Sequence, residues 1–294
     1  MTNDLRSPCN PLVWVLAAGA VACASAPKDP KIPESRFAAF EGSRVHYQEY
    51  GHGKEALVFV HGWSGSGEVW NRQAAYFAGR VPVLVVDLIG HGRSDAPKTN
   101  YSFATMARSI EAVMRDAGVE RAVLVGHSNG MPTIREFYRL FPAKTLALVD
   151  VDGTLRPFFR DAKEAEPFLA MFQSPKYKET VEQFIRQTFS PKLPEESQQK
   201  ILATALATPQ HVLIGTMQAN LDPEVWKDDP IEVPFLLLLA KQEFWEGDYQ
   251  QYVMKLAPQA EWHMDDGLGH FIQLETPDTV NERIAAFLAK NRLL

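Results

Sequence analysis

Short apolar runs alternate with amphipathic stretches along most of the chain. Five of the runs are continuous, as expected of strands buried on both faces, at residues 56–60, 81–86, 122–125, 146–151 and 234–240. Helical patterning predicts helices between and after them, at residues 68–79, 102–118, 131–141, 249–256 and 276–290, with a further strand at 261–264. Repeated strand–helix units predict an α/β fold, in which a mostly parallel sheet carries helices on both faces.

Two stretches depart from this alternation. Residues 37–40 and 44–50 alternate apolar and polar positions around Gly42 and Ser43, which predicts an antiparallel hairpin. Residues 155–232 hold aromatic-rich helical segments that are broken by prolines and show no strong strand pattern. We interpret this second stretch as a helical cap inserted between two strands of the sheet.

The N-terminal region has a different pattern. Residues 12–24 form an uninterrupted apolar run that is too short to span a membrane comfortably, and Arg6 is the basic residue before it. Residues 20–23 (Ala-Val-Ala-Cys) resemble a bacterial lipoprotein cleavage site, and a Pro-rich stretch follows. We therefore predict export, to the periplasm or to a membrane anchor through a lipidated Cys23. A plain signal peptide or an uncleaved anchor are the alternatives.

These patterns divide the 294 residues into a leader and tether (1–34), a core in two parts (35–154 and 233–294) and the cap (155–232). The two cysteines, Cys9 and Cys23, both lie in the leader, so the predicted folded domain has no disulfide and no cysteine-based metal site. A net charge of −6 without a Lys/Arg run argues against nucleic acid or an anionic membrane surface as the main partner.

The strongest chemical signal is Gly126-His-Ser-Asn-Gly130, which follows the strand at 122–125 and precedes the helix at 131–141. In this strand–turn–helix context a G-x-S-x-G sequence places its serine on a sharp turn, and the flanking glycines let the backbones approach closely. The start of the helix also favours developing negative charge. We predict that Ser128 is a nucleophile, and an ordinary turn serine is the alternative.

A serine nucleophile needs a base, and His270 is the best placed of the eight histidines. It lies in the loop after the last strand, at the sheet edge where Ser128 is expected. His127 is adjacent to the serine in sequence, but its side chain should point away from it. Structural roles are expected for five of the others: His46, His52, His61, His91 and His263.

The carboxylate that orients the base is less clearly indicated. Glu243 follows the strand at 234–240 and is preferred, and Asp152, after the strand at 146–151, is the alternative; Glu246 and Asp248 are further candidates. For the oxyanion, one backbone N–H should come from Asn129. The other should come from Trp63, in the glycine-rich loop after the strand at 56–60.

The motifs His61-Gly-Trp63, residues 87–95, 126–130 and 233–240, and Gly269-His-Phe271 occur in an order that resembles the α/β-hydrolase superfamily. The resemblance implies an eight-stranded sheet with a helical cap between strands six and seven. It also implies that Ser128, His270 and the N–H groups of Trp63 and Asn129 are the matching functional positions. The family's usual acid position carries Glu243. A serine nucleophile, rather than an aspartate, argues against the haloalkane-dehalogenase and epoxide-hydrolase branches.

The expected function is hydrolysis of an ester, lactone or related acyl substrate through an acyl-enzyme. Hydrolysis of a carbon–carbon bond by the same three residues is one alternative, and a catalytically silent binding protein of this fold is another. The expected partner is a small, partly apolar acyl molecule. Aromatic and apolar side chains of the cap are candidates for its pocket, although packing within the cap is the preferred explanation for most of them: Phe158, Phe159, Phe168, Met171, Phe172 and Trp226. This chemistry needs no cofactor, and we see neither a metal cluster nor a cofactor-binding glycine pattern.

Overall fold

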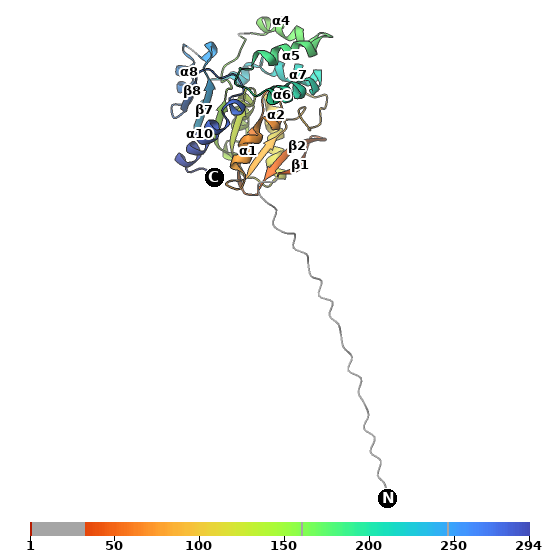
Figure 1. Cartoon of the computed structure of the whole chain (residues 1–294), viewed down its shortest axis with the longest axis vertical. Coiled ribbons are helices and arrows are strands. Elements are labelled where there is room, and N and C mark those ends of the chain that lie inside the picture. Colours follow the sequence, from red (N-terminus) through yellow and green to blue (C-terminus); the bar gives the residue numbers. More distant parts are fainter. Residues whose placement is uncertain (2–32, 160, 246) are drawn as a thin grey trace.

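A computed structural model of the chain describes Met1 and residues 33–159, 161–245 and 247–294 (Figure 1). The expected leader, including Cys9 and Cys23, lies outside the described residues except at its end, where Glu34 begins the first strand. In the part of the chain that is described, no helix is both long and apolar enough to cross a bilayer.

Eight strands form a single sheet in the order β1-β2-β4-β3-β5-β6-β7-β8. Their bounds are β1 (Glu34–Phe40), β2 (Ser43–Tyr50), β3 (Glu55–Val60), β4 (Val83–Val86), β5 (Arg121–His127), β6 (Thr145–Val151), β7 (Phe235–Ala240) and β8 (Glu261–Asp265). Strand β2 is antiparallel to both β1 and β4, and the pairs from β4 through β8 are parallel. The predicted hairpin and the predicted mostly parallel, eight-stranded α/β sheet are both confirmed.

Helices follow the strands in the predicted alternation. Their bounds are α1 (Asn71–Phe77), α2 (Phe103–Asp116), α3 (Gly130–Leu140), α4 (Ala162–Gln173), α5 (Tyr177–Gln187), α6 (Glu195–Ala207), α7 (Gln210–Ala219), α8 (Tyr249–Leu256), α9 (Ile272–Glu275) and α10 (Pro277–Lys290). Short 3-10 turns are η1 (Gly67–Trp70), η2 (Pro142–Lys144), η3 (Pro223–Trp226) and η4 (Glu243–Trp245). Helix α2 illustrates the local rules, because the Ser102 hydroxyl accepts a hydrogen bond from the Thr105 N–H at its start.

The apolar runs are continuous because the sheet is covered on both faces. Along β3, the side chains of Ala56, Val58 and Val60 pack in one core cluster with α2, α3 and α8. Leu57 and Phe59 point to the opposite face, into a second cluster with α1 and α10. Neighbouring residues of one strand thus enter different cores, which explains why all positions of β3 from Ala56 to Val60 are apolar.

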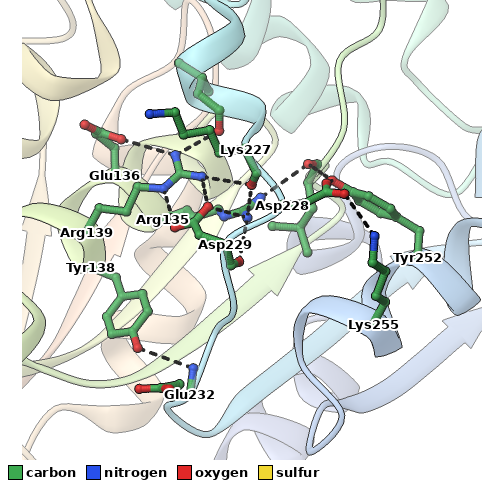
Figure 2. Close-up of polar contacts among 12 residues, drawn as sticks. Arg135, Glu136, Tyr138, Arg139, Lys227, Asp228, Asp229, Glu232, Tyr252 and Lys255 are labelled. Carbon is green, nitrogen blue, oxygen red and sulfur yellow. Dashed lines mark hydrogen bonds and ion pairs between the residues drawn. The ribbon is translucent and has the colours of Figure 1, made fainter.

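Helices α4 to α7 and η3 lie between β6 and β7 in the chain, and Figure 1 shows the four α-helices grouped at one end of the molecule. We call residues 155–232 the cap; its exact boundaries remain a prediction. The segment by which the cap returns to the core, around residues 227–229, is held by helix α3, as Figure 2 shows. The buried Arg135 donates to the carbonyl of Lys227 at 2.6 Å, and Arg139 forms a two-point ion pair with Asp229.

Tyr252 of α8 ties together the two ends of the cap. Its hydroxyl lies 3.3 Å from the carbonyl oxygen of Leu155, where the cap begins, and 3.0 Å from the carboxylate of Asp228, where it returns. Arg135 also reaches the Leu155 carbonyl, at 3.4 Å. The connectors are therefore anchored to the core, which sets where the cap helices lie relative to the sheet edge.

The chain order changes direction between β3 and β5, which are neighbours in the sheet although β4 lies between them in sequence. Loops that leave such strands at their carboxyl ends diverge and create a crevice where ligands bind in open α/β sheets. The loop after β3 and the turn after β5 therefore meet at the crevice where this fold is expected to bind a ligand.

Candidate active site

Ser128 lies on the tight turn between β5 and α3, with a backbone φ of +54°. This left-handed conformation is strained for a residue with a side chain. Both flanking glycines are required by packing: a Cβ on Gly126 would approach the Gly130 carbonyl carbon to 2.6 Å, and one on Gly130 would approach the Val60 oxygen to 2.6 Å. The predicted strand–turn–helix setting of Ser128 is confirmed.

His270 lies in the loop between β8 and α9, and its Nδ1 lies 2.7 Å from Oδ2 of Asp152. Asp152 follows β6 directly, has a φ of +51° and is 1% exposed. Its carboxylate also accepts hydrogen bonds from the N–H of Ala240 at 2.9 Å and from the amide of Gln242 at 3.3 Å. With Nδ1–H donating to this carboxylate, Nε2 is left free to accept a proton.

Of the two preferred candidates for the acid, the structure therefore places Asp152, the alternative, against His270. The left-handed turn at Asp152 directs its side chain across the end of β7, where the Ala240 N–H and His270 meet it. Glu243 instead begins η4. Of the other candidates, Asp248 is exposed and pairs with Arg156 at 2.9 Å, and Glu246 lies outside the described residues.

The loop after β3 touches the turn that carries Ser128. A Cβ on Gly62 would lie 2.8 Å from the Ser128 Cβ, so the two backbones meet with no room for a side chain between them. Within the described part of the chain, the backbone N–H groups of Trp63 and Asn129 donate no hydrogen bond. These are the two groups predicted to bind the oxyanion.

His61 controls the direction of the Trp63 N–H. The Leu88 N–H donates to His61 Nε2 at 3.0 Å, so the ring proton is on Nδ1, which donates to the Gly62 carbonyl at 2.8 Å. In a trans peptide the C=O and the following N–H point in opposite directions, so fixing this carbonyl also fixes the Trp63 N–H. Burial lowers the pKa of His61, which keeps the ring neutral in this role. The predicted scaffold role of His61 is confirmed.

His127 has a role that the sequence did not reveal. Its Nε2 lies 2.9 Å from the carbonyl oxygen of His270, and the centroids of the two rings are 4.6 Å apart. Burial, followed by the charge of His270, lowers the pKa of His127 well below its usual value. A neutral His127 can support the base without repelling it when the base is protonated.

A second carboxyl group, Asp150, lies fully buried in β6. Its Oδ1 accepts a hydrogen bond from the Gly153 N–H at 2.7 Å, which closes the turn that contains Asp152. Burial raises the pKa of Asp150 well above its ordinary range, which favours the neutral form of this group. An aspartate inside a continuous apolar strand was the available signal for this role.

Ser128 and His270 line one cavity of about 1270 Å³ between the sheet edge and the cap. The cap contributes an aromatic wall that includes Phe159, Phe168 and Phe184. The Trp63 ring contacts this wall, with its centroid 5.5 Å from that of Phe184. The indole N–H of Trp63 donates to the Leu213 carbonyl at 3.0 Å. The loop after β3, which carries the backbone N–H of Trp63, is thus attached to the cap.

The structure shows no hydrogen bond between the described residues Ser128 and His270, a contact that often tightens only when substrate binds.

A family model described as the alpha/beta hydrolase family matches residues 57–283. The chain belongs to the alpha/beta hydrolase family. The comparison covers all the elements that carry Ser128, Asp152 and His270.

Individual relatives of this hydrolase differ in how much of it they match. It is 28% identical to the 2-hydroxy-6-oxononadienedioate/2-hydroxy-6-oxononatrienedioate hydrolase of Paraburkholderia phymatum, over 84% of this chain and 91% of that protein. It is 32% identical to an uncharacterized protein of Mycobacterium tuberculosis, but over 44% of this chain and 38% of that relative's length.

Solved structures with the same fold include enzymes of several kinds. An N-acyl homoserine lactone degrading enzyme is 27% identical, with a TM-score of 0.70 over 86% of this chain and 100% of that one. An esterase from Exiguobacterium antarcticum has a TM-score of 0.75 over 87% of this chain and 100% of that one; at 19% identity it shows the shared fold alone.

Proposed function

We propose that the protein is a serine hydrolase of neutral esters or lactones, in which Ser128 is the nucleophile, His270 the base and Asp152 the orienting acid. The observation that carries the proposal is the strained turn at Ser128 beside two unpaired backbone N–H groups and a carboxylate-bound histidine, all at one cavity. A binding protein has no use for this combination of groups.

In the proposed reaction, His270 Nε2 takes the proton of Ser128 as the hydroxyl oxygen attacks the substrate carbonyl carbon. The N–H groups of Trp63 and Asn129 stabilise the resulting oxyanion. Collapse of this intermediate breaks the bond to the leaving alcohol, which takes the proton from His270 and leaves an acyl-Ser128. Water, activated by His270, then releases the acid and restores the serine.

The cavity favours a neutral, apolar acyl group. Among the described residues that line it, the lysine and arginine side chains are Arg72 and Lys200, and both are exposed. Lys200 also forms an ion pair with Glu196. A buried anion needs a paired cation to offset its desolvation, and the aromatic walls offer none. The likeness to the N-acyl homoserine lactone degrading enzyme supports a lactone or ester of this kind.

Carbon–carbon bond hydrolysis is the second candidate, and the Paraburkholderia phymatum relative favours it. The substrate named for that relative is a dicarboxylate. The scarcity of cations along the described cavity wall argues against a dianionic substrate here.

Turnover of two substrate panels tests the proposal. One panel holds 4-nitrophenyl esters of increasing acyl length and a neutral lactone, and the other holds a dicarboxylate ring-fission product. The expected result is Ser128-dependent hydrolysis of the first panel with little turnover of the second. The reverse preference would establish the carbon–carbon hydrolase, and no turnover by a folded preparation of either panel would contradict a hydrolytic function.

We also propose that the chain is exported and tethered to a bacterial envelope membrane through Cys23, on the sequence pattern of residues 12–24. The mass of the mature N-terminus is the test. A lipidated Cys23 as first residue is the expected result, and an intact Met1 would contradict it.

A further inference from the structure

The loop that carries His270 is in direct contact with the cap. The His270 N–H donates to the carbonyl of Thr188, at the end of α5, with an N···O distance of 3.1 Å. A Cβ on Gly269 would lie 2.8 Å from the backbone nitrogen of Ser190, so a side chain has no space there. The main chain of the base is therefore held by the cap at this point, not by the sheet.

Glu275, at the end of α9, joins the two sides of this contact. One oxygen of its carboxylate, Oε2, accepts from the Gly269 N–H at 2.9 Å and from the Ser190 hydroxyl at 2.6 Å. The other oxygen, Oε1, is buried and has no hydrogen-bond partner among the described residues. A carboxylate that is partly shielded from water is strongly destabilised when one of its remaining hydrogen-bond donors is removed. Glu275 thus favours the arrangement in which Ser190 packs against the loop that carries His270, which we call the base loop.

Three separate contacts now define the position of His270. Asp152 orients the ring through Nδ1, His127 donates to the carbonyl oxygen, and Thr188 accepts from the N–H. Two of these lie in the core, and the third lies in the cap. A shift of the cap segment would move the backbone of the base, and small displacements of a catalytic group are costly to the rate.

We propose that Glu275 is a positioning residue. Through Ser190, its contact in the cap, it couples the position of the cap to the orientation of His270. The proposal rests on the proposed function, because it takes His270 as the base. Closure of the cap over an acyl group and completion of the catalytic geometry then occur as one event.

The decisive variant is Ser190→Ala, and the chain offers a matched control in Ser174→Ala. Both serines lie in the cap just after a helix, and both hydroxyls accept a hydrogen bond from the N–H two residues later, at 3.1 Å and 3.2 Å. Ser190 also donates to Glu275, whereas Ser174 donates to Met171 within the cap. The two substitutions therefore differ in their effect on the base loop.

With a short-chain ester, Ser190→Ala should lower kcat roughly fivefold to twentyfold and change KM by less than roughly twofold. Ser174→Ala should change both by less than roughly twofold. If Ser190→Ala behaves like its control, or raises KM alone as expected of a lost substrate contact, the coupling is wrong.

Substitution of Glu275 separates positioning from simple stability. Glu275→Ala should lower kcat at least as much as Ser190→Ala, and Glu275→Gln should restore most of it, because the amide oxygen accepts from the same two donors. The double variant of Ser190→Ala and Glu275→Ala should be no worse than Glu275→Ala alone. Independent, multiplying losses would contradict a shared contact.

Hydrogen exchange makes the test independent of turnover. The peptide that contains residues 266–275 should exchange faster in Ser190→Ala than in wild type or Ser174→Ala. If the wild type shows no Ser128-dependent turnover, the proposed function fails, and exchange still reports on the contact. Unchanged exchange in Ser190→Ala would overturn the coupling even if the enzyme is active.

Discussion

The part of the molecule that the structure describes contains two sets of serine, histidine and aspartate. In one, Ser35 Oγ lies 3.0 Å from His46 Nε2, and His46 Nδ1 lies 2.8 Å from Asp87. In the other, His270 is bound to Asp152 at 2.7 Å but not to Ser128. Judged by hydrogen bonds alone, the first set is the more complete.

The surroundings reverse that judgement. Ser35 lies in the regular edge strand β1, and its hydroxyl is also held by Arg93 at 2.9 Å. Ser128 lies on a left-handed turn beside unpaired N–H groups, on the wall of a large cavity. A triad of residue types is thus not sufficient for a hydrolase: the strained turn, the oxyanion donors and the cavity distinguish the site.

The largest effect is expected from substitution of the aspartate in each set. Asp152→Asn should lower kcat by roughly 10³-fold to 10⁴-fold in a folded protein, because the amide favours the wrong tautomer of His270. Asp87→Asn should instead lower the unfolding midpoint, since Asp87 accepts from Gly67 and Arg93 backbone N–H groups as well as from His46. Ester turnover and urea unfolding measure the two effects.

Glu243→Gln is the control for the aspartate variants. It should keep kcat within roughly twofold of wild type, because Asp152 already holds the base. A loss with Glu243→Gln comparable to that with Asp152→Asn would return the acid role to Glu243.

A smaller effect is expected from His61, which supports the oxyanion donor that the Ser35 set lacks. In His61→Ala the Gly62 carbonyl loses its hydrogen bond from Nδ1 and keeps only the longer one from the Gly65 N–H, at 3.2 Å, so the Trp63 N–H is less firmly fixed. We expect kcat to fall roughly tenfold to a hundredfold, less than the loss of a donor itself. Active-site titration checks that the fraction of folded enzyme is the same. An unchanged kcat would show that the Trp63 N–H is held by other contacts.

The smallest effect concerns stability and pH. His91 packs against His61, with the two ring centroids 5.1 Å apart. Burial, followed by the charge of His61, lowers the pKa of His91 to about 3. The folded protein keeps this ring neutral, whereas the unfolded chain binds a proton below about pH 6.5. Its contribution to stability is complete above that pH and is lost as the pH falls toward 3.

Between pH 7 and pH 5, wild type should therefore lose about 2 kcal/mol more unfolding free energy than His91→Asn. Urea unfolding at the two pH values measures this difference. Equal losses in the two proteins would mean that His91 is protonated in the folded state.

The sequence was informative where function depends on local structure. Ser128 and His270 could be predicted because a strand–turn–helix and a loop after the last strand bring both to one edge of the sheet. The acid could not, because Asp152 and Glu243 follow β6 and β7, which are adjacent in the sheet. The choice between them depends on a backbone φ of +51° and on one N–H of Ala240, neither of which a pattern of residue types reveals.

Contacts between distant parts of the chain were equally invisible. The bond from His127 to the His270 carbonyl spans 143 residues, and the Ser190–Glu275 contact spans 85. No periodicity connects such positions, because they meet through the packing of the cap and the base loop on a finished sheet. The aromatic residues of the cap were recognised as a group, but which of them line the cavity depends on how the helices pack.

Covalent labelling with a fluorophosphonate probe tests the central claim most directly, because the two serine sets make opposite predictions. If Ser128 is the nucleophile, mass spectrometry should find the label on Ser128, Ser128→Ala should abolish labelling, and Ser35→Ala should leave the labelling rate within roughly twofold of wild type. Labelling that survives Ser128→Ala, or that requires Ser35, would contradict it.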